Sequence, residues 1–294
     1  MNRHTGRIDD FGMDTISLAG PLPAKLRAIR DAGFSQVMLS ARDLVGHAEG
    51  VEAAIAAVRA SGLRVTGFQV LRDFEGLSGH LHDYKVDIAK SMLAMCKALG
   101  APVLLACSTT SAHAEDDRAR MAADLAKLAM LAVPFGIDIA FEGLSWGRFV
   151  NDVPAAWDLV ERADRYNLGL ALDSYHMLAT STPLDILDDI DPARIFFVQL
   201  SDFMWTSTPT PDERRETARH FRVFPGEGVH SDAIAALVRR LDENGYAGDI
   251  SFEVFNDDYV QMPLDTVVAR ANRSVQWLLA QVPRRSLPFR RRAG

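Results

Sequence analysis

The chain has 294 residues, of which 48% are hydrophobic and 24% are charged. This composition is ordinary for a soluble globular protein, and the length suits either one α/β barrel or two smaller domains. The net charge of −7 argues against nonspecific nucleic-acid binding, which relies on a basic surface.

The N-terminal residues and the cysteines bear on the cellular compartment. Residues 1–7 are not followed by the apolar stretch of a secretory signal, and no apolar run approaches the length of a membrane span. The two cysteines, Cys96 and Cys107, lie in apolar stretches and are too few for a disulfide framework. We therefore expect a cytoplasmic protein with reduced thiols and no membrane contact.

Short apolar runs alternate with helix-like stretches along the first half of the chain. A proline lies near the start of the first helix-like stretch, and Gly33, Gly62 and Gly100 follow the ends of three of them. Pro134 must end the fourth helix or lie beyond its last turn. We expect strands over 13–18 (ending near Ser17), 36–39, 64–72 and 103–107, and helices over 21–32, 51–60, 83–99 and 116–135.

The same alternation continues through the second half. A long loop, 201–230, follows the seventh expected strand, and loops of that length tend to be lids or binding loops. Ser231 is expected to cap the helix after it. We expect strands over 137–142, 168–173, 195–199 and 249–253, and helices over 154–166, near 183–187, over 232–244 and over 264–279.

This alternation predicts a single (β/α)8 TIM-barrel domain that spans residues 1–294. A doubly wound open sheet is the alternative, but no Gly-x-Gly-x-x-Gly follows the first strand, so a dinucleotide-binding fold has little support. A basic tail begins at about residue 283, and we expect it to be disordered or to contact another subunit. Whether the chain forms a homo-oligomer stays open.

The later strands end in oxygen-bearing side chains. In a parallel barrel all strand C-termini open on one face, which carries the chemistry. Carboxylates held together there need a cation between them, and oxygen ligands suit Mg²⁺ or Mn²⁺, with Co²⁺ or Zn²⁺ able to substitute. The alternative is that each is an ordinary polar strand end that faces water. The predicted ligands of one divalent metal are Glu142, Asp173, Gln199 and Glu253.

Three further residues are candidates for catalysis. His176 follows Asp173 by three residues and would lie beside the metal, where a histidine suits general acid or base chemistry. Its alternatives are a supporting hydrogen bond or metal ligation. Arg72 at the end of the third strand and Arg222 before the helix over 232–244 suit an anionic substrate group, although surface arginines are common.

These motifs resemble those of the xylose-isomerase-like barrel superfamily, which includes sugar isomerases and epimerases, inosose dehydratases and endonuclease IV. The resemblance rests on Glu142, Asp173-x-x-His176, Gln199 and Glu253 on successive strands and covers nearly the whole chain. Many members carry a histidine on strand seven, where this chain has Gln199-Leu200-Ser201-Asp202-Phe203. That segment, with residues 221–228 and 252–257, is similar to bacterial 3-dehydroshikimate dehydratases.

The resemblance implies a hydro-lyase that converts 3-dehydroshikimate, a small anionic hydroxy-ketone, to protocatechuate and water. The metal would act as a Lewis acid on the ketone, and His176 would move the proton or protonate the leaving hydroxyl. Arg72 or Arg222 would hold the substrate carboxylate. Some relatives carry a further dioxygenase-like domain, so a chain of this length is expected to be a single-domain form.

Three other functions compete with this one. The runner-up is a sugar or sugar-phosphate isomerase or epimerase with the same metal site, against which the missing strand-seven histidine counts. A DNA-repair enzyme like endonuclease IV would need more histidines and is at odds with the negative charge. A noncatalytic sugar-binding barrel would not need the intact set of predicted ligands.

Overall fold

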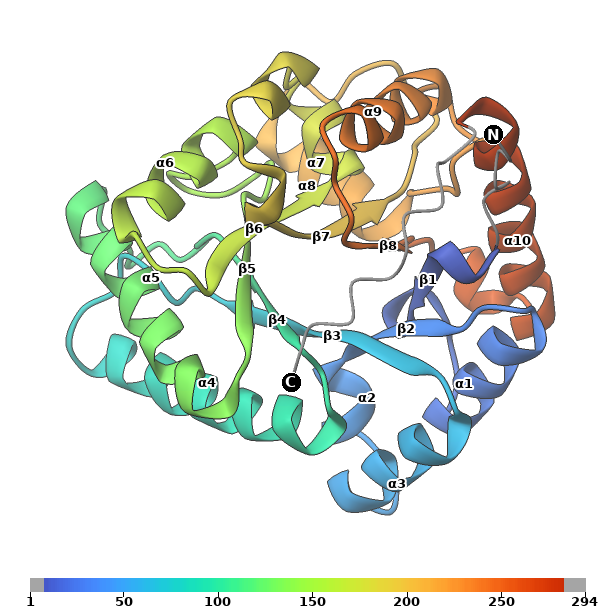
Figure 1. Ribbon diagram of the computed structural model, residues 1–294, viewed down its shortest axis with the longest axis horizontal. Helices are drawn as coiled ribbons and strands as arrows, with labels where there is room; N and C mark the ends of the chain where they lie inside the picture. Colours follow the sequence, from blue (N-terminus) through green and yellow to red (C-terminus); the bar gives the residue numbers. More distant parts are fainter. Residues whose placement is uncertain (1–7, 283–294) are drawn as a thin grey trace.

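A computed structural model describes residues 8–282 of the chain. Its parallel strands pair in chain order, and β8 pairs with β1 to close a barrel surrounded by helices (Figure 1). The predicted (β/α)8 fold is confirmed, and the open doubly wound sheet is excluded. The strands are β1 Phe11–Asp14, β2 Gln36–Ser40, β3 Arg64–Arg72, β4 Val103–Cys107, β5 Asp138–Glu142, β6 Leu168–Asp173, β7 Ile195–Leu200 and β8 Asp249–Phe252.

The strands are buried on both faces, which explains why they read as continuous apolar runs in the sequence. In β4, Leu104 and Ala106 belong to the large core cluster that includes the surrounding helices. The alternate residues Val103, Leu105 and Cys107 belong to a smaller cluster made mostly of strand residues. Because side chains alternate along a strand, Cys107 lies on the inner side of the barrel.

The helices cover the outside of the barrel and connect its strands (Figure 1). The α-helices are α1 Leu22–Asp31, α2 Ala41–Val45, α3 Val51–Ser61, α4 Gly79–Leu99, α5 Arg118–Ala132, α6 Val153–Ala163, α7 Ser174–Ala179, α8 Pro211–His220, α9 Ser231–Glu243 and α10 Leu264–Gln281. The 3-10 helices are η1 Ile8–Asp10, η2 Thr15–Ser17, η3 Val133–Phe135, η4 Leu184–Asp188, η5 Pro192–Arg194 and η6 Tyr259–Gln261.

The first strand is shorter than predicted. It ends at Asp14, because the following residues form the 3-10 helix η2 instead of continuing to Ser17. The short helix expected near 183–187 is likewise a 3-10 helix, η4. The fourth predicted helix ends at Ala132, and Pro134 lies in η3 directly after it. The first strand and the fourth helix thus end earlier than predicted, and the helix near 183–187 differs in type and not in length.

The segment 201–230 is not one long loop. It contains α8, whose N-cap Thr210 forms a capping box with Glu213, and Pro211 is its first residue. These signals are present in the sequence and define a helix start. Ser231 does not cap α9, whose N-cap is His230. The Ser231 hydroxyl instead donates to Asp202 Oδ2 at 2.6 Å.

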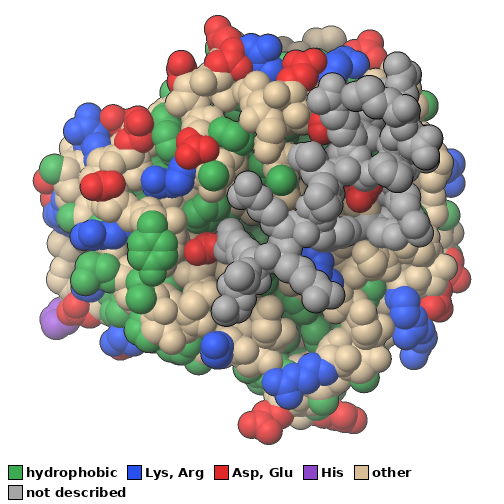
Figure 2. Space-filling model, viewed as in Figure 1, with side chains coloured by type: hydrophobic (Ala, Val, Ile, Leu, Met, Phe, Trp, Pro, Cys, Tyr) green, Lys and Arg blue, Asp and Glu red, His purple; other side chains and the backbone are tan. Residues whose placement is uncertain are grey.

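Several other features concern the surface and the thiols. Within residues 8–282, no helix is long and apolar enough to cross a membrane. Cys96 and Cys107 are both buried, and neither forms a disulfide, as expected of reduced thiols. Acidic and basic side chains are interspersed around the rim of the face shown in Figure 2. The basic tail predicted from about residue 283 lies outside the described residues.

Candidate active site

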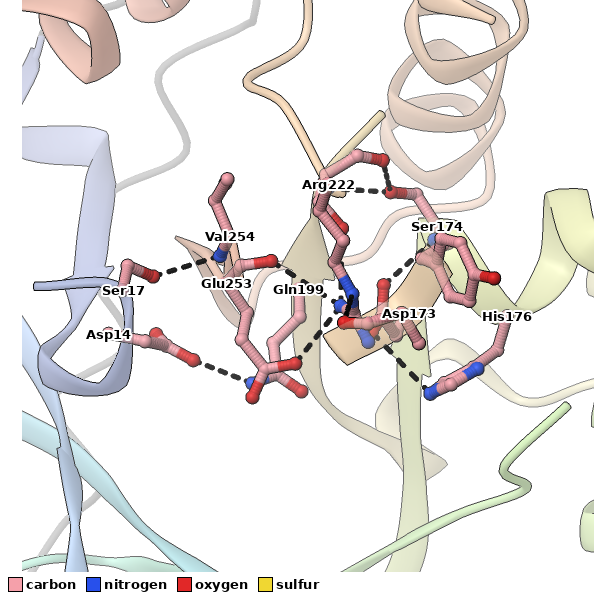
Figure 3. Close-up of polar contacts among 12 residues, drawn as sticks. Asp14, Ser17, Asp173, Ser174, His176, Gln199, Arg222, Glu253 and Val254 are labelled. Atoms are coloured by element: carbon pink, nitrogen blue, oxygen red, sulfur yellow. Dashed lines mark hydrogen bonds and ion pairs between the residues drawn. The ribbon is translucent and has the colours of Figure 1, made fainter. Parts of the chain in front are cut away.

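The four predicted metal ligands converge at the C-terminal end of the barrel. Glu142 and Asp173 end β5 and β6, Gln199 is the penultimate residue of β7, and Glu253 follows β8 directly. All four side chains are buried. The parallel register pairs Asp173 with Gln199, and Figure 3 shows Asp173, Gln199 and Glu253 gathered around a shared space.

Arg222 joins two of these carboxylates. Its Nη1 donates to Asp173 Oδ2 at 2.6 Å and to Glu253 Oε2 at 3.1 Å (Figure 3). The side chain is 2% exposed, and its guanidinium lies over the Tyr175 ring. Burial alone would lower the pKa of Arg222, but the two carboxylates raise it above its ordinary value. The guanidinium therefore stays charged and holds Asp173 and Glu253 in place.

Two oxygen atoms of the predicted ligands have no hydrogen-bond partner within the described part of the chain. Cys107 Sγ donates to Glu142 Oε2 at 2.9 Å, which leaves Glu142 Oε1 unpaired. The Gln199 amide nitrogen donates to Asp14 Oδ2 at 2.6 Å, which leaves Gln199 Oε1 unpaired. Buried polar atoms are almost always hydrogen-bonded, because leaving one unpaired costs free energy. A cation between these oxygens would satisfy both.

The pKa values in the cluster point to the same need for positive charge. Burial, then repulsion from Asp173 and Glu253, raises the pKa of Glu142 to about 8. Burial also raises the pKa of Glu253 to about 7, against the opposing attraction of Arg222. One arginine thus does not neutralise three buried carboxylates near neutral pH, and the cluster favours uptake of protons or a cation.

His176 lies on α7 beside this cluster. Its Nε2 is 3.7 Å from Asp173 Oδ2 and 4.0 Å from Glu142 Oε1. The Ser145 backbone N–H donates to His176 Nδ1 at 3.2 Å, so Nδ1 is the acceptor and Nε2 carries the proton in the neutral ring. Burial, then the positive charges of Arg222 and Arg72, holds the pKa of His176 well below its usual value. A neutral imidazole therefore presents an N–H to the site.

The two predicted arginines lie in different surroundings. Arg72 is exposed at the end of β3, and it forms no ion pair among residues 8–282. Its charge nonetheless lowers the pKa of Glu253 as a minor contribution, so it lies within electrostatic reach of the cluster. Arg222 is instead buried against the carboxylates. Arg72 is thus the arginine that remains free to meet an anionic ligand.

Glu142, Asp173 and His176 could hold a metal ion, because one ligand atom from each lies within 4.8 Å of the others. This group shares two residues with the predicted set. The participation of Gln199 and Glu253 stays a prediction. If Nε2 of His176 were a ligand, Nδ1 would have to carry the proton and could no longer accept from the Ser145 N–H. Nδ1–H could then donate to the Ser145 hydroxyl at 3.0 Å, so each tautomer of His176 has a partner in Ser145.

Sequence reasoning missed several residues of the site. Asp14 ends β1, is completely buried and contacts Gln199, while Gln69 of β3 and Ser251 of β8 contact Asp14. The signal for Asp14 was present: Phe11-Gly12-Met13-Asp14 is an apolar run that ends in an acid, as in the later strands. The expectation that the strand continued to Ser17 hid it.

Comparison with known proteins agrees with this architecture. A family model described as "Xylose isomerase-like TIM barrel" matches residues 26–281. The 3-dehydroshikimate dehydratase of Pseudomonas aeruginosa is 37% identical over 265 residues, which are 90% of this chain and 41% of that protein. The chain therefore spans less than half the length of this curated relative.

Solved structures show the same fold. A xylose isomerase-like TIM barrel/4-hydroxyphenylpyruvate dioxygenase fusion protein superposes with a TM-score of 0.84 at 34% identity, over 92% of this chain and 42% of that one. The IolI protein with a bound zinc atom superposes with a TM-score of 0.77 at 20% identity, over 92% of this chain and 98% of that one.

Proposed function

From the premise that this chain belongs to the xylose isomerase-like TIM barrel family, we propose that it is a metal-dependent 3-dehydroshikimate dehydratase. The proposed reaction removes water from 3-dehydroshikimate and gives protocatechuate. The Pseudomonas aeruginosa relative supports this substrate by its name and its identity along the barrel. The observation that carries the proposal is the pair of unpaired, buried oxygens on Glu142 and Gln199, next to the carboxylates of Asp173 and Glu253.

These four side chains fit one hard divalent cation, with Mg²⁺ or Mn²⁺ favoured by the all-oxygen donor set and Co²⁺ or Zn²⁺ as substitutes. When bound, the ion would supply Lewis-acid polarisation of the substrate ketone. The arginine and thiol contacts described above hold Asp173, Glu253 and Glu142 in position without it. The donor atoms are therefore arranged before the ion arrives.

The chain's own residues supply the remaining functions. Arg72 is free at the mouth of the barrel, and we assign it to the substrate carboxylate, since guanidinium groups bind carboxylates with two hydrogen bonds. His176 presents Nε2–H to the site; to protonate the leaving hydroxyl it would first take up a second proton on Nδ1, beside the Ser145 hydroxyl at 3.0 Å, so that a neutral ring remains after the transfer. Arg222 serves to orient Asp173 and Glu253 and lies too deep among them to leave for the substrate.

The test is ultraviolet absorbance over time. Purified protein is mixed with 3-dehydroshikimate and Mg²⁺ or Mn²⁺, with and without a chelator. We expect the protocatechuate chromophore to appear and the chelator to abolish it. Absence of product with every divalent ion would overturn the proposal and favour the sugar isomerase or epimerase alternative, which a screen of ketose sugars would then address.

A further inference from the structure

A buried polar network lies beneath the candidate metal site. Asp14, the last residue of β1, is 0% exposed and accepts hydrogen bonds on both carboxylate oxygens. Oδ1 accepts from the Ser251 hydroxyl. Oδ2 accepts from Gln199 Nε2 at 2.6 Å (Figure 3) and from Gln69 Nε2 at 3.3 Å. The network therefore joins β1, β3, β7 and β8 across the inside of the barrel.

The amide of Gln199 is held by both of its N–H groups. One N–H points to Asp14 Oδ2 at 2.6 Å, and Nε2 also donates to Gln69 Oε1 at 3.3 Å. Gln69 in turn donates its own N–H to Asp14, so the three side chains form a closed triangle. Rotating the Gln199 amide by half a turn would bring its oxygen against two acceptor oxygens and lose both hydrogen bonds.

The orientation matters because the two ends of an amide differ chemically. An amide oxygen is a ligand for hard divalent cations, whereas the amide NH₂ group offers only donors. In the observed orientation Gln199 Oε1 is buried and unpaired among the described residues. The triangle thus selects which end of Gln199 faces the other predicted ligands.

We propose that Asp14 is a positioning residue that, together with Gln69, fixes the Gln199 amide with its oxygen toward the metal. This inference rests on the proposed metal site. The role assigned to Asp14 involves no contact with the substrate. Hydrogen-bonded partners behind a metal ligand commonly change metal affinity by about 10- to 100-fold when they are removed. Asp14 and Gln69 are the partners behind Gln199.

The experiment measures Mn²⁺ affinity by titration calorimetry and by the electron paramagnetic resonance of free Mn²⁺, with no substrate present. Asp14→Ala removes both acceptors, and we expect Mn²⁺ affinity to fall by about 10- to 100-fold. Asp14→Asn is the matched control. Its amide oxygen can still accept from Gln199 while its NH₂ donates to Ser251, so we expect affinity within about threefold of the wild type.

A second substitution separates orientation from packing. In the Asp14→Ala background, Gln199→Glu replaces the amide with a carboxylate, both ends of which are oxygen ligands. The double variant should recover at least about tenfold in Mn²⁺ affinity over Asp14→Ala alone. Gln199→Glu alone is the control, because an added carboxylate attracts a cation in either background. A purely structural role for Asp14 predicts equal gains in the two backgrounds, whereas loss of the amide orientation predicts a larger gain in Asp14→Ala.

The outcomes are distinguishable. A wild-type protein that binds no Mn²⁺ would overturn the proposed metal site, and this inference with it. A wild type that binds Mn²⁺ alongside an Asp14→Ala variant of equal affinity would overturn this inference alone. Equal losses in Asp14→Asn and Asp14→Ala would show an effect of charge and would also overturn it. If circular dichroism shows that Asp14→Ala is unfolded, Gln69→Met tests the second acceptor, with a several-fold loss expected and no change contradicting the proposal.

Discussion

Two acidic clusters, one fully buried and one partly buried, lie near the C-terminal ends of the strands, and they differ in their hydrogen-bond partners. The ligand cluster consists of Glu142, Asp173 and Glu253. The loop cluster consists of Asp73 and Glu75, which follow β3, and Asp124 of α5. Burial raises the pKa of Glu75 and of Glu142 to the same value of about 8. A perturbed pKa therefore does not tell the two clusters apart.

The hydrogen bonds do tell them apart. Each carboxylate of the loop cluster accepts a backbone N–H: Asp73 from Thr110 at 2.8 Å, Glu75 from Thr109 at 2.5 Å, and Asp124 from Gly76 at 2.9 Å. These bonds tie the loop after β3 to its neighbours. In the ligand cluster, among the described residues, only Asp173 accepts a backbone N–H, from Tyr175 at 2.8 Å; Asp173 and Glu253 share the Arg222 guanidinium, and Glu142 accepts from Cys107. The contrast teaches that burial and a raised pKa do not by themselves mark a carboxylate as a candidate metal ligand.

The largest expected difference between the two clusters appears when one acid is removed from each. Glu142→Ala or Glu253→Ala should abolish turnover and bound metal together, because each removes a predicted ligand. Glu75→Gln, in the loop cluster, should keep turnover within a few-fold of wild type. Steady-state kinetics and metal analysis by mass spectrometry check both. Near-normal activity of Glu142→Ala with metal still bound would contradict its assignment as a ligand.

A substitution at His176, which lies beside the ligand cluster, separates catalysis from metal binding. His176→Ala should lower kcat by about 100- to 10,000-fold, the usual range for a lost general acid, while metal content stays close to that of wild type. The physical reason is that Nε2 supplies a proton and does not complete the coordination. Equal loss of metal and of kcat would make His176 a ligand instead.

A substitution at Arg72 tests how the site binds the substrate. Arg72→Met should raise KM by about tenfold or more with a smaller change in kcat, because it removes a charge-assisted contact to the substrate carboxylate. Mn²⁺ affinity should change less than KM, since Arg72 contacts none of the predicted ligands and acts on Glu253 only through its charge. The conservative Arg72→Lys variant should restore part of the loss. An unchanged KM in Arg72→Met would assign the anion to another residue.

The smallest expected effect is on the stability of the protein, and it comes from a substitution in the loop cluster. The pKa of Glu75 is raised from 4.5 in the unfolded chain to about 8 in the folded protein. Between these values the unfolded chain is ionised while the folded protein keeps the proton, so the stabilising contribution of this proton is lost as pH rises toward 8.

Glu75→Gln removes this titration. The unfolding free energy of the variant relative to the wild type should therefore rise between pH 5 and pH 8, by a few kcal/mol at most. Urea unfolding of the metal-free proteins at several pH values measures it. A difference that is constant with pH would show that Glu75 titrates normally in the folded protein.

The fold could be predicted from the sequence because its pattern is local. Each buried strand is an apolar run, and the runs alternate with helix signals such as Gly62 and Gly100, which both adopt left-handed conformations directly after their helices. Helix α8 carries its own start signals, but the length of the segment 201–230 favours a loop. The errors thus arose where a short local signal was outweighed by the longer pattern.

The site was predictable only in part. Strand-end position predicted that the side chains of Glu142, Asp173, Gln199 and Glu253 would converge, because parallel strands open on one face. It could not show that Arg222 would be buried between two of them, since that depends on how the segment after α8 folds back. The orientation of the Gln199 amide was also beyond reach, because Gln69 and Asp14, which set it, lie far away in the sequence.

The contact between Asp14 and Ser251 has a consequence for the order in which the protein is made. It joins the first strand to the last, and a second bond at the same seam links Ser17 with Val254 at 2.8 Å (Figure 3). A ribosome-bound chain that ends before β8 has neither these bonds nor Glu253. Asp14 and Gln199 can meet once β7 has emerged, but the pocket proposed to hold a cation is completed only when the last strand has emerged and closed the seam.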